Sequence, residues 1–318
     1  MYHIPDDTLD RWLREDAPYL DLTTHTLGLG PEAARIAFHT RQPVVVCGTE
    51  EAARILAAAG GGGSLEFRVS SLELYQAALS SPELQTLNAK LDFALPSGAT
   101  AAPGDLLLAA TGPAGALHIA WKVCANILEH ASGIATRTRQ LVETARAAAP
   151  SGRHISVAAT RKGFPGTREL AIKAVLAGGG VPHRLGLSET LLVFAQHRAF
   201  FPSDTVFASK IPELKARACE KKFIVEADTP EEARRWADAG ADGVQFDKLP
   251  PPALAEAVAA LRAAHPGLLI LAAGGINAAN AAAHAATGVD ALVTSSMFSA
   301  PPADIRVTIQ PLPGTSHA

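Results

Sequence analysis

The chain has 318 residues, of which 48% are hydrophobic, and its 28 Lys and Arg against 31 Asp and Glu leave a net charge of −3. This composition predicts a globular protein with one large or two smaller domains, and the near-neutral charge excludes the broad basic field that duplex nucleic acid or an acidic membrane selects. The cysteines are odd in number, lack CxxC spacing and do not indicate a disulfide framework or a zinc site. With no signal-like start and no run of roughly 20 apolar residues, we expect a soluble, cytoplasmic protein.

Residues 1–117 have the pattern of an α+β domain. An amphipathic helix is predicted from about Asp6 to Pro18, and DLTT then leads into extended chain. Further on, short β-rich segments broken by Gly and Pro turns surround one helical segment, EEAARILAAA; the strands are RIAFHT, PVVVCG, LEFRVS and DLLLAAT. We predict an antiparallel sheet here, joined by the tail 301–318, in which RVTIQ is a possible last strand.

Residues 118–300 have the pattern of an α/β domain. A long helix is predicted from about Leu117, and apolar strands then alternate with amphipathic helices; the strands are HISVAAT, LLVF, KFIVEAD, GVQFD, LLILAAGG and ALVTSS. Repeated βα units predict a parallel sheet covered on both faces, and their number favours a closed or nearly closed barrel. A doubly wound open sheet is the alternative.

Two acids follow adjacent predicted strands. Glu226 comes after FIV, and Asp247 comes after GVQF. In α/β barrels the functional residues lie at the C-terminal ends of the strands. The pair is therefore a candidate for accepting hydrogen bonds from sugar hydroxyls or for holding a hydrated divalent cation. The alternative is that both are helix N-caps or solvated loop acids, since DTPEEA after Glu226 supplies a capping signal.

Four basic residues form a candidate anion site. Arg161 and Lys162 directly follow an apolar strand, and His183 and Arg184 end the Gly-rich segment after the next helix. Arg suits bidentate recognition of carboxylate or phosphate, Lys acts as a point charge, and His donates without a fixed charge. The alternative is a solvated surface.

A second anion site is predicted at the last two strand ends. Gly274 and Gly275 form a turn that opens the predicted helix NAANAAAHAA, and Ser295 begins the next loop. Glycines let backbone N–H groups approach a phosphate, although a purely structural turn is the alternative. Two anion sites around an acid pair, without a nucleophile and base, indicate an enzyme that positions a phosphorylated sugar and an organic anion.

A series of motifs adds a family resemblance over nearly the whole chain. The motifs, in order, are EDAPYLDLTT, ANILEHASGIATRTR, TRKGFPGTREL, AVLAGGGVPHRLGL, FIVEAD, QFDK and AAGGI. The sequence resembles the quinolinate phosphoribosyltransferases, or nicotinate-nucleotide pyrophosphorylases, of the type II phosphoribosyltransferase fold. The resemblance implies an N-terminal sandwich domain, an incomplete α/β barrel and a homodimer with shared active sites. It also implies that a pyridine nitrogen displaces diphosphate from phosphoribosyl diphosphate, with release of carbon dioxide.

The resemblance also implies roles for the candidate residues. Those expected to act in catalysis are Lys162, Glu226 and Asp247. Glu226 and Asp247 would serve the ribose hydroxyls and Mg²⁺, and Lys162 would lie between the acid substrate and the diphosphate. The residues expected to face the acid substrate are Arg161, His183 and Arg184, and those expected at the 5′-phosphate are Gly274, Gly275 and Ser295.

Departures from the family pattern gather on the acid-binding side. Phe194 stands where a substrate-contacting lysine is expected, and Lys122 replaces an arginine that reaches the neighbouring subunit's site. Such changes should weaken binding of a second carboxylate and favour the ModD-like branch, which is associated with molybdenum transport operons. We therefore expect a phosphoribosyltransferase for an organic acid or heterocycle other than quinolinate. The alternatives are an authentic quinolinate enzyme and a non-catalytic protein that binds an anion such as molybdate.

Overall fold

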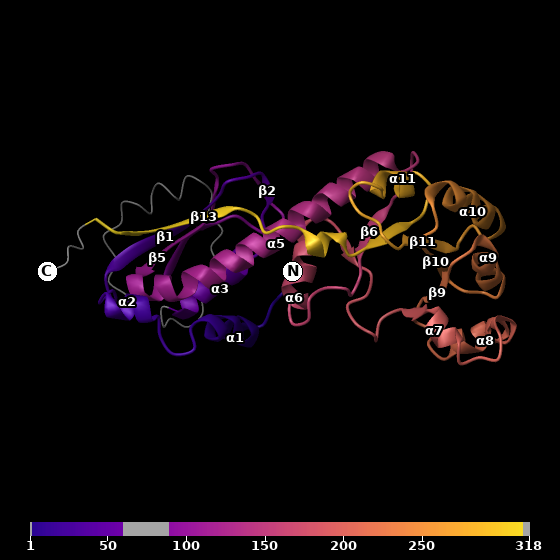
Figure 1. Ribbon diagram of the computed structural model, residues 1–318, viewed down its shortest axis with the longest axis horizontal. Helices are drawn as coiled ribbons and strands as arrows, with labels where there is room; N and C mark the ends of the chain where they lie inside the picture. Colours follow the sequence, from indigo (N-terminus) through magenta and orange to yellow (C-terminus); the bar gives the residue numbers. More distant parts are fainter. Residues whose placement is uncertain (1, 60–88, 314–318) are drawn as a thin grey trace. The chain divides into compact units, whose positions relative to one another are not determined.

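The computed structural model describes residues 2–59 and 89–313 (Figure 1). The chain divides into two compact units. Unit 1 contains Met1–Thr136, Gly166–Gly178 and Ala300–Ala318, and unit 2 contains Arg137–Pro165 and Gly179–Ser299. The long predicted helix is α5 (Ala114–Ala148), which contributes residues to both units.

Unit 1 contains an antiparallel sheet. Its strands, in spatial order, are β13 (Ile305–Pro311), β1 (Ala33–Thr40), β5 (Leu106–Pro113) and β3 (Lys90–Ala94). The tail strand RVTIQ is confirmed, since β13 pairs with β1 with Ile309 opposite Ile36, and the two run side by side in Figure 1. The predicted strand LEFRVS lies outside the described residues.

Helices and a short strand pair complete unit 1. They are α1 (Asp6–Asp16), α2 (Leu22–Thr26), α3 (Thr49–Ala59), α6 (Arg168–Ala177), β2 (Val44–Val45) and β4 (Thr100–Ala101). The prediction of extended chain after DLTT is wrong at α2, because the Asp21 side chain accepts hydrogen bonds from the backbone N–H groups of Thr23 and Thr24 and so caps a helix.

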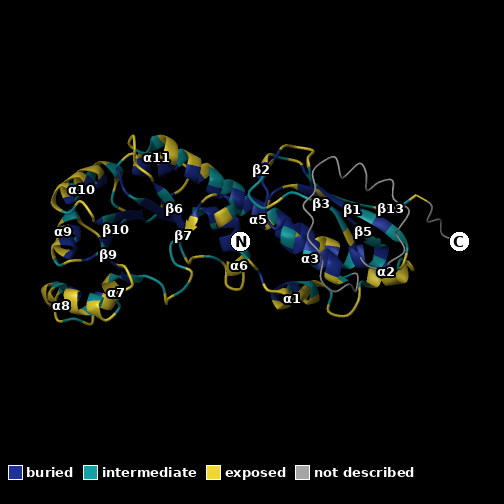
Figure 2. Cartoon of the chain, turned by 180° about the vertical axis from the view of Figure 1, so that it is seen from behind, coloured by how far each residue is buried: buried dark blue, intermediate teal, exposed yellow. Residues whose placement is uncertain are grey.

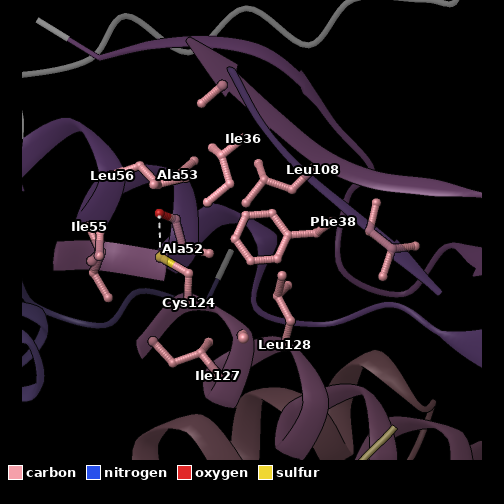
Figure 3. Packing of buried hydrophobic residues seen from close by; sticks show 14 of the residues in the cluster. Ile36, Phe38, Ala52, Ala53, Ile55, Leu56, Leu108, Cys124, Ile127 and Leu128 are labelled. Carbon is pink, nitrogen blue, oxygen red and sulfur yellow. Dashed lines mark hydrogen bonds between the residues drawn. The ribbon is translucent and has the colours of Figure 1, made fainter. Parts of the chain in front are cut away.

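The core of unit 1 is built between its sheet and its helices. Figure 3 shows the Phe38 ring of β1 packed near Leu108 of β5 and Leu128 of α5. Cys124 of α5 is fully buried in the same cluster, and its thiol donates to the carbonyl oxygen of Ala52 in α3 at 3.4 Å. Burial of this apolar surface holds the sheet and the helices together.

Unit 2 contains a parallel sheet of seven strands. In spatial order they are β7 (Val181–Pro182), β6 (Ser156–Ala159), β12 (Ala291–Thr294), β11 (Leu269–Ala273), β10 (Gly243–Asp247), β9 (Phe223–Ala227) and β8 (Leu191–Val193). The last strand in sequence, β12, pairs with the first, β6. That cyclic order defines a barrel interrupted between β7 and β8, so the incomplete barrel is confirmed and the doubly wound alternative is wrong.

Short connections and helices surround this sheet. They are α7 (Ala195–Arg198), α8 (Asp204–Ala216), α9 (Pro230–Asp238), α10 (Pro251–Ala264), α11 (Ala281–Ala285) and the 3₁₀ turn η1 (Ser296–Ser299). Figure 2 shows the strands of unit 2 largely buried and the outer faces of α8 and α10 exposed. Among the described residues, no helix is long and apolar enough to cross a membrane.

Candidate active site

Alternate residues of the parallel strands face the interior of the incomplete barrel. The buried interior cluster consists of Ala158, Leu192, Ile224, Leu271, Ala273, Ala291 and Val293. Because side chains alternate along a strand, Glu226 shares the face of Ile224 on β9. On β10 the interior positions are Gly243, Gln245 and Asp247, and this strand contributes none of the apolar cluster. The sequence therefore places polar groups on β9 and β10 at the C-terminal end of the barrel.

Glu226 and Asp247 interact in this interior. Burial, followed by the negative charge of Asp247, raises the pKa of Glu226 above its ordinary value. The buried Gln245 amide donates to Glu226 Oε2 at 3.2 Å, so it fixes one carboxylate oxygen. Neither acid is a helix cap, since Thr229 caps α9 and Pro250 precedes α10. The structure therefore favours a ligand-binding pair over the capping alternative.

Arg198 binds the backbone of Glu226, and no pattern in the sequence predicts this contact. Its guanidinium donates to the Glu226 carbonyl oxygen at 2.9 Å and to Asp204 at 3.3 Å, and it lies 4.9 Å from the centre of the Trp236 ring. Only 8% of the Arg198 side chain is exposed. Such a buried, multiply bonded cation restrains the end of β9 and thereby the position of the Glu226 carboxylate.

The turns after β10 and β11 are in close contact. Gly274 has φ +89°, and a Cβ placed on it would lie 2.5 Å from Asp247 Oδ1 and 2.7 Å from Lys248 N. Only glycine allows this approach. Gly275 also has a left-handed φ of +72°, but a Cβ placed on it would meet nothing within 4 Å. Gly274 thus brings the predicted phosphate turn directly against Asp247.

The helix after this turn begins later than the sequence predicts. Residues 277–280 form a turn, and α11 starts only at Ala281. The side-chain amides of Asn277 and Asn280 both donate to the carbonyl oxygen of Gly275 at 3.1 Å. Because asparagine competes with helical hydrogen bonding in this way, the expectation that Gly274 and Gly275 open the helix is wrong.

The cationic residues gather at the ends of β6 and β7. The His183 backbone N–H donates to Ala159 O at 2.9 Å, and the Lys162 N–H donates to Thr160 Oγ1 at 3.1 Å. Burial, followed by the positive charge of Arg161, lowers the pKa of Arg184. Mutual repulsion of this kind favours binding of an anion between them.

His183 is held neutral in this cluster. Burial and the charge of Arg184 lower the pKa of His183 to about 4. His183 Nε2 and Arg184 Nε are buried and have no hydrogen-bond partner within the described residues. Unpaired buried polar atoms are costly, so both atoms mark a place where a ligand group would be stabilised.

The remaining candidates are divided between the two units. Phe194 is half-buried, packs against the apolar interior cluster and stacks on the His197 ring at 5.7 Å between centroids. Ser295 is half-buried directly after β12. Lys122 belongs to unit 1, where it is exposed on α5 with its ammonium 5.5 Å from the Trp121 ring.

The acid pair fits the magnesium ion that the resemblance implies. Mg²⁺ binds through one or two carboxylates and takes its other ligands from water and substrate phosphates. Glu226 and Asp247 face the same interior from the neighbouring strands β9 and β10 and supply the carboxylate oxygens that this ion prefers. The described residues contain no group of three or more His, Cys, Asp or Glu side chains that would form a cage made only of protein ligands.

Comparisons with known proteins agree with this fold. The models of the N-terminal and C-terminal domains of quinolinate phosphoribosyl transferase match residues 21–132 and 134–308. ModD of Rhodobacter capsulatus is 40% identical over 89% of this chain and 96% of its own length. The human carboxylating nicotinate-nucleotide pyrophosphorylase is 29% identical over 93% of this chain and 88% of its own length.

A solved structure shows the same fold. The nicotinate-nucleotide pyrophosphorylase from Francisella tularensis superimposes with a TM-score of 0.77 at 21% identity, covering 97% of this chain and 98% of that chain. The fold and the matched domains together define a phosphoribosyltransferase of the pentosyltransferase class. The chain belongs to the quinolinate phosphoribosyl transferase family, and its relatives include the ModD proteins.

Proposed function

We propose that the protein transfers a phosphoribosyl group from phosphoribosyl diphosphate to the ring nitrogen of a heteroaromatic acid that carries fewer negative charges than quinolinate. The observation that carries this proposal is the interior acid pair, Glu226 and Asp247, of which Asp247 lies directly against the Gly274 turn. An acid pair suits the ribose hydroxyls and a glycine turn suits a phosphate, so one phosphorylated sugar satisfies both.

In this mechanism the chain acts by positioning and charge. Glu226 and Asp247 accept hydrogen bonds from the ribose hydroxyls and would hold Mg²⁺, which when bound neutralises charge on the departing diphosphate. The acceptor nitrogen donates its lone pair to the ribose anomeric carbon while the bond from that carbon to diphosphate oxygen breaks. Lys162, exposed at the end of β6, stabilises the negative charge that develops on the leaving group.

The cationic cluster orients the acceptor. Arg161 and Arg184 face a carboxylate, and neutral His183 adds a hydrogen bond without a further charge. Phe194 offers an apolar ring against which a heteroaromatic ring can stack. This combination favours one carboxylate on an aromatic ring over the two of quinolinate.

The reaction is tested by adding phosphoribosyl diphosphate, Mg²⁺ and a panel of heteroaromatic acids and measuring diphosphate release. We expect release with a monocarboxylic acceptor and a loss of roughly 100-fold or more in Glu226→Gln or Asp247→Asn, because each removes an interaction with charge or hydroxyl groups of the sugar. Glu256→Gln is the matched control, since Glu256 is exposed on α10. Full activity in both acid variants would remove these residues from the site.

Phe194→Lys tests the acceptor preference. We expect the added charge to strengthen quinolinate binding about tenfold, as one further charge-assisted hydrogen bond would. Phe194→Leu keeps the position apolar and should bind quinolinate as weakly as the unmodified protein. Calorimetric titration with quinolinate measures both, and tight quinolinate binding before any substitution would instead support the authentic quinolinate enzyme.

We also propose a cytoplasmic homodimer with shared sites. Lys122 and Trp121, the latter 37% exposed, present a charged and an apolar group together on one part of α5. Lys122 would reach the substrate bound by the partner subunit, where it keeps the charge of an arginine but loses the bidentate geometry. The three cysteines are free thiols, which fits a reducing compartment.

A further inference from the structure

Lys248, the residue after Asp247, has an unusual backbone conformation. Its φ is 60°, whereas the other positive φ values within the described residues belong to glycines. A residue with a Cβ is strained in this left-handed region, and such strain is often found at functional sites. The Lys248 N–H donates to Ala273 O at 2.8 Å, which holds the backbone in place.

This conformation directs the lysine side chain along the Gly274 turn. A Cβ on Gly274 would lie 2.5 Å from Lys248 Cγ, so the stem of the lysine lies against the Gly274 backbone. The ammonium lies 3.5 Å from Asp247 Oδ2, and 77% of the side chain is exposed. The ammonium therefore lies near Asp247 and the glycine turn and is accessible to a ligand.

The charges of the site explain why a cation is needed there. Glu226 and Asp247 face the same interior from the neighbouring strands β9 and β10, so two negative charges already lie on this face. A phosphoribosyl diphosphate brings further negative charge to the same carboxylates, and like charges at close range disfavour binding. A lysine beside Asp247 offsets this repulsion before the substrate arrives.

We propose that Lys248 is a further phosphate-binding residue, whose ammonium turns from Asp247 to a phosphate oxygen when phosphoribosyl diphosphate binds. This inference rests on the proposed function. The oxygen belongs either to the 5′-phosphate or to the diphosphate, which share the same chemistry. Because the lysine also repels Mg²⁺ at Asp247, its removal has opposite effects on the two ligands.

Calorimetric titration of the intact protein tests this. The unmodified protein is first titrated with phosphoribosyl diphosphate and Mg²⁺, and absence of binding there would contradict the proposed function itself. In Lys248→Met we expect about tenfold weaker binding of phosphoribosyl diphosphate, since a charge-assisted hydrogen bond is lost. Parallel titrations with ribose 5-phosphate and with inorganic diphosphate identify which phosphate loses the contact.

Further variants separate this role from a structural one. Lys248→Gly relieves the left-handed strain, so it should keep or raise the thermal midpoint while still losing binding. Lys248→Arg should retain binding, and Lys221→Met is the control at an exposed lysine of unit 2. Tighter binding of Mg²⁺ alone in Lys248→Met would support the proposal that the Lys248 ammonium offsets the charge of Asp247 in the free protein. Unchanged affinity for phosphoribosyl diphosphate in both Lys248→Met and Lys248→Gly would overturn the proposal.

Discussion

Gly274→Ala is expected to abolish detectable binding of phosphoribosyl diphosphate, with a loss of about 100-fold or more. The new Cβ would lie 2.5 Å from Asp247 Oδ1 and 2.7 Å from the Lys248 backbone nitrogen, so the carboxylate and the turn must move. A displacement of a binding group by about 1 Å can weaken its interaction by roughly 100-fold. Calorimetric titration with phosphoribosyl diphosphate, with Mg²⁺ present, measures the affinity.

Gly288→Ala is the control for backbone strain alone. Gly288 has φ +84°, but the nearest atoms to its added Cβ lie at 3.8 Å. We expect both alanine variants to lose about 1 kcal/mol or more of stability, because alanine is unfavourable at positive φ. Only Gly274→Ala should lose substrate binding, and normal binding by this variant would show that the turn does not position Asp247.

Lys173→Met is expected to destabilise the protein by about 3–5 kcal/mol. In unit 1 the Lys173 ammonium donates to Glu50 at 2.8 Å and to Glu51 at 2.5 Å, with 8% of the lysine and 2% of the Glu51 side chain exposed. Removing the lysine leaves two carboxylates without their cation, one of them fully enclosed, and this costs more than the pair itself contributes. Urea unfolding measures the change.

Lys210→Met provides the comparison for an exposed ion pair. Lys210 and Glu213 lie 3.0 Å apart, but about half of each side chain is exposed (52% and 49%). Solvent screening limits such a pair to at most about 1 kcal/mol. Equal effects of the two substitutions would contradict the buried ion-pair interpretation of Lys173.

The loss of stability in Lys173→Met should depend on pH. Burial raises the pKa of Glu50, but the Lys173 charge and hydrogen bonds from Lys173 and Ser97 hold it below its ordinary 4.5. Burial lowers the pKa of Lys173, but the charges of Glu51 and Glu50 hold it above 10.5. The stabilisation linked to the lowered pKa of Glu50 is complete above pH 4.5 and is lost as the pH falls further. The stabilisation linked to the raised pKa of Lys173 is complete below pH 10.5 and is lost as the pH rises further. The loss of stability in Lys173→Met should therefore be largest between these two pH values.

Local sequence pattern was sufficient to predict the strands that carry the site. Apolar runs ending in an acid predict β9 and β10, and the alternation of strand side chains places Glu226 and Asp247 in the interior. Gln245 was missed although a polar residue inside GVQFD was a usable signal. Its hydrogen bond to Glu226 joins two different strands, which a local pattern does not show.

Other features depended on contacts distant in sequence. Arg198 binds the backbone of Glu226, 28 residues away, and nothing in AQHR indicates this. The strand β7 has only two residues, which is too short to show the alternation by which a strand is predicted. The late start of α11 follows from side-chain hydrogen bonds of Asn277 and Asn280, which compete with helix formation.

Binding of phosphoribosyl diphosphate at Glu226 and Asp247 underlies the proposed function. The most direct measurement is calorimetric titration of the intact protein with phosphoribosyl diphosphate, with and without Mg²⁺, and with molybdate in a parallel experiment. We expect Mg²⁺-dependent binding of phosphoribosyl diphosphate, which is lost in Glu226→Gln and retained in Glu256→Gln. Binding of molybdate without any binding of phosphoribosyl diphosphate would rule out this function and indicate an anion-binding protein.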